Sequence, residues 1–392
     1  MRATRAVAVV SCLVLAAGCT SASGGSGDGS GRGSASPSAT ESEKQTGPIS
    51  VKITPADGAK KIAPNKPIKV SVSGGKLESV SVKGKGKVAG TTAADGLSWQ
   101  SSGTLHPSES YTVRVKAHND GGDKSATASF RTLSVSNSVK ASIAPLDGST
   151  VGVGQPIAVY LTDPVKDRAA VERAMKVVAD NDVEGSWRWF SSTELHYRPK
   201  EYWPAHTKVR LKAQLAGVRA APGLWGVEDR TIDFEIGEKH HSVVNAKKHT
   251  MVVKSGDKVV KRMPVSTGSN KYPSKTGIHV VSGKADPYKM DSTTAGITGS
   301  DAYVTTVRYA VRISNSGEFV HAAPWSASSQ GRRNVSHGCV NVTTERALWF
   351  YNFSQPGDIV DITGTPEKLT STNGFGDWNI SWTAWQKGSA LD

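Results

Sequence analysis

Short runs in which apolar and polar residues alternate recur along most of the chain after about residue 47. Two of them are Lys69-Val70-Ser71-Val72 and Tyr111-Thr112-Val113-Arg114-Val115. A period of two is typical of strands with one buried face, and Pro, Asp and Gly residues separate the runs as turns separate strands. Long amphipathic stretches are scarce. The pattern therefore predicts a mainly β protein.

The pattern also repeats itself at a shift of about 90 residues, since Ile53-Thr54-Pro55-Ala56-Asp57-Gly58 is matched by Ile143-Ala144-Pro145-Leu146-Asp147-Gly148. Repeats of this length with short strands and Pro/Asp/Gly turns favour two tandem immunoglobulin-like β-sandwiches. The Cys…Trp…Cys signature is absent, which excludes the disulfide-bearing type. We interpret Trp99, Trp187 and Trp189 as sandwich core rather than as platforms for stacking sugars.

From about residue 239 the alternation predicts a third, β-rich unit. Residues 249–254 and 258–265 read as the two strands of a hairpin, and residues 303–313 are expected to continue the sheet. Thr343-Thr344-Glu345 offers a threonine N-cap and an acidic first turn. One short helix is therefore expected there, ending at about Phe353.

The first residues have the pattern of a secretory leader. Arg2 and Arg5 precede an apolar run, residues 6–17, that is too short to span a bilayer. Leu15-Ala16-Ala17-Gly18-Cys19 resembles a lipoprotein signal, in which cleavage leaves Cys19 as a lipidated N-terminus. We therefore expect an extracytoplasmic protein anchored to the cell membrane by lipid, with plain secretion as the alternative.

Composition adds two expectations. Residues 20–47 are rich in Ser and Gly with almost no large apolar side chain, so they are expected to form a flexible linker. The net charge is +14, but the Lys and Arg residues are spread along strand-like segments instead of clustering with aromatic residues. Attraction to an anionic cell surface explains this charge more simply than nucleic-acid binding, which we do not expect.

The three cysteines of the sequence have different expected fates. Cys12 is removed with the leader and Cys19 is acylated, so Cys339 has no intramolecular partner in an oxidising compartment. A secreted protein that keeps one thiol usually uses it. His337 lies two residues before Cys339 and His321 lies eighteen before it, so both are candidate bases for a nucleophilic thiol.

Four short motifs surround this cysteine: His321-Ala322-Ala323-Pro324-Trp325, Ser336-His337-Gly338-Cys339-Val340-Asn341, Pro273-x-x-Thr276-Gly277 and Pro356-Gly357-Asp358-x-Val360. Together they resemble the YkuD-type L,D-transpeptidases of the bacterial cell wall, over about residues 239–364. The leader, the two repeats and the tail Gly374-Phe375-Gly376-Asp377-Trp378-Asn379-Ile380 resemble the lipoprotein branch of that family.

The resemblance implies an activity. A cysteine attacks the third residue of a peptidoglycan stem tetrapeptide and releases the terminal D-Ala, and the acyl group then passes to a side-chain amine of another stem. The product is a 3→3 cross-link. The implied partners are donor and acceptor stems and β-lactam inhibitors, carbapenems above all, and the protein would face the cell wall. No cofactor and no metal is implied.

The resemblance also assigns roles. Cys339 is the nucleophile, and His321 is the general base, oriented by the backbone carbonyl of Ala322. The backbone N–H groups of His337, Gly338 and Cys339 are candidates for the oxyanion hole, although His337 could instead only shape the loop. We expect an activated thiol whose pKa is lowered.

Five residues match substrate-pocket positions of the family: Tyr303, Met290, Phe319, Trp325 and Asn341. Trp325 could also be ordinary loop packing. Ala295 replaces a further pocket tyrosine, so contacts from a substrate lid are not carried over. His240, His241 and His249 have no acidic or cysteine partner at ligand spacing, and we expect solvated basic surface there rather than a metal site.

The predicted organisation is a signal peptide (residues 1–18) ending at lipidated Cys19, a linker (20–47), immunoglobulin-like domains (48–134 and 138–237), a catalytic domain (239–364) and a C-terminal extension (365–392) packing on the catalytic domain. Two other functions stay open at this point. Water could replace the acceptor amine, which would make the protein an L,D-carboxypeptidase. A non-catalytic lipoprotein that binds the wall through its repeats is the third possibility.

Overall fold

The computed structural model describes residues 47–391. The predicted signal peptide, Cys19 and almost all of the predicted linker lie outside the described residues. Within residues 47–391, none of the helices combines the length and the hydrophobicity needed to cross a membrane.

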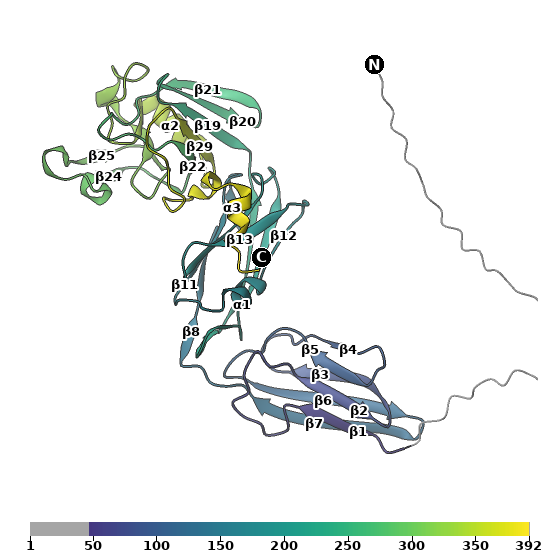
Figure 1. Cartoon of the computed structure of the whole chain (residues 1–392). Coiled ribbons are helices and arrows are strands. Elements are labelled where there is room, and N and C mark those ends of the chain that lie inside the picture. The colour runs from purple at the N-terminus through teal and green to yellow at the C-terminus, as the bar shows by residue number, and fades with distance from the viewer. Residues whose placement is uncertain (1–46, 392) are drawn as a thin grey trace, which may run out of the picture. The chain divides into compact units, whose positions relative to one another are not determined.

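The first repeat forms a sandwich of two antiparallel sheets, as the alternating pattern predicts (Figure 1). Its core includes Trp99, Tyr111 and Val113, which are buried, and along Ser110–Asn119 buried residues alternate with exposed or half-buried ones. One sheet has the order β1 (Ser50–Thr54), β2 (Lys69–Ser73), β5 (Ser98–Ser101), β4 (Gly90–Thr92), and the other has the order β3 (Lys76–Lys83), β6 (Ser110–Asn119), β7 (Gly122–Arg131).

The second repeat forms a larger sandwich around Trp187, Trp189 and Trp203, which are all nearly inaccessible to solvent. Our interpretation of Trp99, Trp187 and Trp189 as core is thereby confirmed. The sheet orders are β13 (Gly185–Trp189), β14 (Glu194–Pro199), β11 (Ile157–Leu161), β9 (Ala141–Ala144), then β10 (Thr150–Val151), β18 (Asp229–Ile236), β15 (Lys208–Gln214), β12 (Met175–Ala179), and the small sheet β16 (Arg219–Ala221), β17 (Leu224–Gly226), β8 (Asn137–Val139), with the short helix α1 (Arg168–Arg173) between strands.

The third unit combines a mixed five-stranded sheet with a four-stranded sheet and a two-stranded hairpin, and the two larger sheets share one apolar core with the helix α2 (Thr344–Phe353). The predicted threonine N-cap is Thr343, whose side chain accepts the N–H of Arg346. The sheet orders are β21 (Lys258–Pro264), β20 (Thr250–Ser255), β19 (His240–Asn245), β29 (Ile359–Thr363), β22 (Gly277–Val280), then β23 (Gly283–Ala285), β26 (Ala310–Arg312), β27 (Phe319–Ala322), β28 (Val340–Val342), and the hairpin β24 (Tyr288–Asp291), β25 (Val304–Val307).

The fold class predicted from sequence is confirmed: a mainly β chain with two immunoglobulin-like sandwiches, a third β-rich unit and the short helix α2 after the cysteine. Residues 303–313 differ from the expectation because they form two strands in different sheets, β25 and β26. Tyr309 between them has a positive φ of 55°, which interrupts the extended backbone. Short 3-10 helices complete the structure at Ser292–Ala295, Gly299–Asp301, Pro324–Ser326 and Gly376–Asn379, and α3 spans Trp382–Gln386.

The C-terminal extension contacts the second sandwich as well as the third unit. Toward the third unit, Asn379 accepts the N–H of Ile278 and donates to its carbonyl. Toward the sandwich, the Trp385 indole donates to the carbonyl of Ser186, and Arg198 lies over the rings of three tryptophans at 4.6 to 5.3 Å. Our expectation named only the catalytic domain, because a tail that carries several tryptophans does not reveal which surface they cover.

A buried ion pair ties the extension to the sandwich. His196 donates from Nδ1 to Asp377 at 2.8 Å, and both side chains are almost fully buried. Burial alone lowers the pKa of His196, but Asp377 and Glu194 outweigh it and raise the pKa from 6.5 to about 9. The contact therefore favours the protonated imidazole.

We expect this pair to make stability depend on pH. Because the pKa of His196 is raised in the folded protein, its stabilisation is fully present below about pH 6.5 and is lost as the pH rises to about 9. The amount is on the order of 3 kcal/mol. Thermal unfolding should show His196→Gln far below the unaltered protein at pH 6 and closer to it at pH 9.

The matched control is His206→Gln, which removes an exposed pair with Glu238 and should change stability little at either pH. A gap between His196→Gln and the unaltered protein that stays constant from pH 6 to pH 9 would contradict the expectation.

Candidate active site

Cys339 lies in a tight turn immediately before β28. Gly338 has a φ of +118°, a conformation that L side chains rarely adopt, so this turn requires glycine. The Cys339 side chain is 6 % exposed and packs with Met290 and Phe319. The turn thus places the only thiol of the described residues at the edge of an apolar cluster.

His321 comes from β27, which pairs in parallel with β28 so that His321 stands opposite Asn341. Its ring is 3 % exposed. Nδ1 donates to the carbonyl of Ala322 at 2.9 Å, which is the contact that the resemblance implied. This bond fixes the tautomer and leaves Nε2 as the atom that can accept a proton.

The two groups rest in neutral form. Burial lowers the pKa of His321 from 6.5 to about 4, in spite of the bond to Ala322. Burial raises the pKa of the Cys339 thiol from 9.0 to about 12. Our expectation of a lowered thiol pKa is therefore wrong, because the surroundings of the sulfur are apolar rather than positively charged. The thiol donates to the carbonyl of Gly317 at 3.6 Å, so the resting state is a thiol and a neutral imidazole.

Three serine hydroxyl contacts hold the backbone around Cys339. Ser274 donates to the carbonyl of Gly338 at 2.6 Å, and Ser336 donates to the carbonyl of Cys339 at 2.7 Å. Ser336 also accepts the N–H of Gly338 at 3.1 Å. Because that N–H is engaged, Cys339 and His337 are better candidates than Gly338 for the oxyanion hole.

Two cavities meet at Cys339. The larger has a volume of about 690 Å³ and the smaller about 300 Å³. The structure brings the predicted pocket residues together around them: Met290, Tyr303, His337 and Cys339 line both, His321, Trp325 and Asn341 line the larger one, and Phe319 and Ala295 line the smaller one. Trp325 is 61 % exposed, so its ring forms a wall of the larger cavity rather than part of the core.

Comparison with known proteins leads to the same family as the sequence motifs do. Residues 239–362 match the family model described as the L,D-transpeptidase catalytic domain, and residues 59–219 match the bacterial Ig domain. The chain is 35 % identical to L,D-transpeptidase 2 of Mycobacterium tuberculosis (strain CDC 1551 / Oshkosh) over 339 residues, covering 85 % of this chain and 83 % of the relative. This chain belongs to the L,D-transpeptidase family.

Two further relatives agree with this assignment. L,D-transpeptidase 5 of Mycobacterium tuberculosis (strain ATCC 25618 / H37Rv) is 34 % identical over 348 residues, covering 86 % of this chain and 76 % of the relative. A solved structure of an LD transpeptidase in complex with imipenem has a TM-score of 0.51 at 36 % identity, covering 58 % of this chain and 99 % of that one. This L,D-transpeptidase is accordingly an acyltransferase.

The exposed ring of His337 lies between two tyrosines of this L,D-transpeptidase. The ring centroids of His337 and Tyr272 are 4.7 Å apart, and those of His337 and Tyr303 are 5.1 Å apart. Burial, and then Cys339, raise the pKa of Tyr303, so its hydroxyl is a donor near neutral pH. His337 and Tyr303 therefore form an aromatic part of the lining of both cavities, and Tyr272 packs against His337.

Two of the three histidines that we expected at a solvated surface have side-chain hydrogen-bond partners. His240 donates to Asp358 at 3.0 Å and His249 donates to Asn334 at 2.9 Å. Burial lowers the pKa of His241. The expectation of a solvated surface is therefore wrong. Sequence spacing did not reveal these partners because Asp358 and Asn334 lie far from the histidines along the chain. Within residues 47–391, no His, Cys, Asp and Glu side chains gather in a group that could hold a metal ion.

Sequence reasoning also missed residues that line or support the site of this L,D-transpeptidase. Ser274 is one of the unassigned positions inside the matched Pro273-x-x-Thr276-Gly277 motif, which was the signal that could have identified it. Glu318 is an almost fully buried acid directly before the buried strand β27, and a buried charge needs a compensating partner. Tyr272 had no distinguishing signal.

Proposed function

We propose that this L,D-transpeptidase forms 3→3 peptidoglycan cross-links through an acyl-enzyme on Cys339. The observation that carries the proposal is that Cys339 and a histidine with fixed tautomer, His321, line one cavity. The thiol proton passes to Nε2 of His321 as sulfur bonds to the carbonyl carbon of the third stem residue. The bond from that carbon to the D-Ala nitrogen then breaks, and His321 returns the proton to the leaving amine.

The second half-reaction reverses these steps. A side-chain amine of another stem loses a proton to His321 and attacks the thioester, and the carbon–sulfur bond breaks to restore the Cys339 thiol. The second cavity beside Cys339 supports transfer to an amine, because one cavity can hold each stem. Hydrolysis by water, the L,D-carboxypeptidase reaction, is the alternative fate of the same thioester.

We expect purified protein to convert a stem tetrapeptide and an acceptor amine into a cross-linked product with release of D-Ala, as read by mass spectrometry. Saturating acceptor should suppress hydrolysis, because both fates consume one intermediate. Cys339→Ser should give neither product. Tripeptide as the only product at every acceptor concentration would favour the carboxypeptidase.

We also propose that the protein is anchored to the cell membrane through Cys19 and faces the cell wall. The leader pattern of residues 1–19 supports this. We expect labelled palmitate to be incorporated during growth and Cys19→Ala to abolish the label. Unlabelled protein released into the medium would point to plain secretion instead.

We further propose that carbapenems acylate Cys339. The strained β-lactam carbonyl would replace the stem carbonyl, and the relative solved in complex with imipenem supports the choice of drug. The lining of the larger cavity by His321, Trp325 and Asn341 supports binding at the same place as the donor stem.

A further inference from the structure

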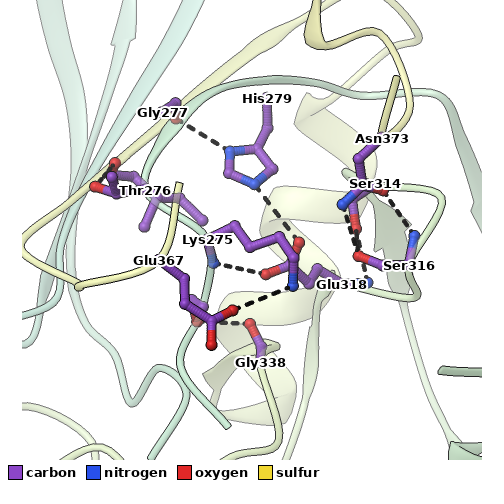
Figure 2. Close-up of polar contacts among 12 residues, drawn as sticks. Lys275, Thr276, Gly277, His279, Ser314, Ser316, Glu318, Gly338, Glu367 and Asn373 are labelled. Atoms are coloured by element: carbon purple, nitrogen blue, oxygen red, sulfur yellow. Dashed lines mark hydrogen bonds and ion pairs between the residues drawn. The ribbon is translucent and has the colours of Figure 1, made fainter. Parts of the chain in front are cut away.

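A buried acid and a buried histidine lie together next to the Cys339 turn. Glu318, just before β27, is 4 % exposed, and His279 in β22 is 0 % exposed. Nε2 of His279 is 3.7 Å from one carboxylate oxygen of Glu318, and its Nδ1 donates to the carbonyl of Gly277 at 3.1 Å. Figure 2 shows the two side chains facing one another, with Lys275 beside them. Such a pair costs desolvation energy, so its presence calls for an explanation.

The other carboxylate oxygen of Glu318 has a structural partner. It accepts the backbone N–H of Lys275 at 2.8 Å. Burial by itself raises the pKa of Glu318, but His279 and Lys275 outweigh it and lower the pKa below 4.5, so the side chain is a carboxylate. Glu318 also lies against the turn, because a Cβ placed on Gly338 would be 3.6 Å from its Cγ.

The residue before Lys275 contacts the turn directly. Ser274 is completely buried, accepts the N–H of Gly268 at 2.9 Å and donates to the carbonyl of Gly338 at 2.6 Å. The peptide between Gly338 and Cys339 is planar and trans, so its C=O and N–H point in opposite directions. Holding the carbonyl of Gly338 therefore fixes the direction of the Cys339 N–H, the candidate oxyanion donor.

We propose that Glu318 and Ser274 are positioning residues for acyl transfer. Glu318 holds the backbone of Lys275, Ser274 on the same segment holds the carbonyl of Gly338, and the Cys339 N–H is thereby aimed at the oxygen that becomes negative in the tetrahedral intermediate. His279 faces the other oxygen of the carboxylate at 3.7 Å and contributes an electrostatic contact there, not a hydrogen bond. This role rests on the proposed function in that Cys339 forms an acyl-enzyme.

Two reactions of the Cys339 thiol distinguish a positioning role from a general disruption of the site. Acylation by imipenem passes through an oxyanion, whereas alkylation by iodoacetamide does not. Both are measured on the full chain by intact mass, with imipenem at saturating concentration. Removing an oxyanion-hole donor costs on the order of 10² to 10³-fold, so a misdirected donor should cost about 10 to 100-fold. Ser274→Ala and Glu318→Leu should slow acylation by that factor and leave alkylation as fast or faster.

Two further variants complete the design. Glu318→Gln keeps an oxygen that can accept the N–H of Lys275, so it should acylate within about threefold of the unaltered protein. His240→Gln removes another histidine–carboxylate pair, between a partly buried histidine and the buried Asp358, that makes no hydrogen bond to the turn, and it should leave both rates within about threefold. If Glu318→Leu does not fold, the comparison of acylation with alkylation in Ser274→Ala is the test of this role.

The role is overturned if acylation is unchanged in Ser274→Ala and Glu318→Leu, if both reactions slow in parallel, or if Glu318→Gln is as slow as Glu318→Leu. Failure of the acyl-enzyme itself has a different signature. In that case the unaltered protein takes up no imipenem although iodoacetamide still alkylates Cys339, and the proposed function falls together with this role.

Discussion

Cys339→Ser is expected to abolish the covalent adduct between this protein and imipenem. The unaltered protein should gain one drug mass, less any fragment lost, and peptide mapping should place that mass on Cys339. A serine hydroxyl at this position is a weaker nucleophile and far harder to ionise than a thiol, and the apolar surroundings that already raise the thiol pKa would penalise an alkoxide still more. We expect the acylation rate to fall by at least about 10³-fold.

The fold should survive this substitution. Cys339 is in no disulfide, and its side chain makes a single weak hydrogen bond, to the carbonyl of Gly317, which a hydroxyl can also make. Thermal unfolding of Cys339→Ser should therefore match that of the unaltered protein. An adduct mapped to any other residue, or one that persists in the folded serine variant, would remove Cys339 from the mechanism.

Much of the site could be predicted from the sequence because the residues that form it lie near one another along the chain. Gly338 and Cys339 are adjacent, and the strand that carries His321 ends at Ala322, from where a single segment, residues 323–337, leads directly to them. The bond from His321 to Ala322 is local too, since it joins neighbouring residues. The alternation of apolar and polar residues, together with the repeat at a shift of about 90 residues, likewise predicted the two sandwiches.

The rest could not be predicted because it depends on tertiary packing. The raised pKa of Cys339 comes from burial against Met290 and Phe319, which lie on different strands. The partner of His240 is Asp358, 118 residues away. Sequence shows which groups can ionise, whereas the environment that sets their pKa values exists only in the folded chain.

The C-terminal extension illustrates the same limit and links the second sandwich to the thiol. Asn373 accepts the N–H of Ser316 and donates to its hydroxyl, both at 2.8 Å. The next residue, Gly317, supplies the carbonyl that the Cys339 thiol contacts. The extension that is tied to the sandwich through Asp377 therefore also holds the loop on which the resting thiol depends.

The resting protonation states predict an unusual pH dependence of acylation. With a His321 pKa of about 4 and a Cys339 pKa of about 12, both groups stay neutral between pH 6 and pH 9. The population of the reactive pair is then constant, so the imipenem acylation rate of the unaltered protein should be level across this range. A thiol with a lowered pKa and no base would instead gain rate up to its pKa and then level off.

His321→Ala should change both the rate and the shape of this profile. Without the base only the thiolate reacts, and its population rises tenfold for each pH unit below a pKa of about 12. We expect a loss on the order of 10² to 10⁴-fold near neutral pH, shrinking steadily toward pH 9. His240→Gln changes a partly buried histidine that is paired with Asp358 away from the thiol, and this variant should keep the level profile. A tenfold rise per pH unit in the unaltered protein, or a level profile in His321→Ala, would show that His321 is not the base and that the neutral pair is not the reacting state.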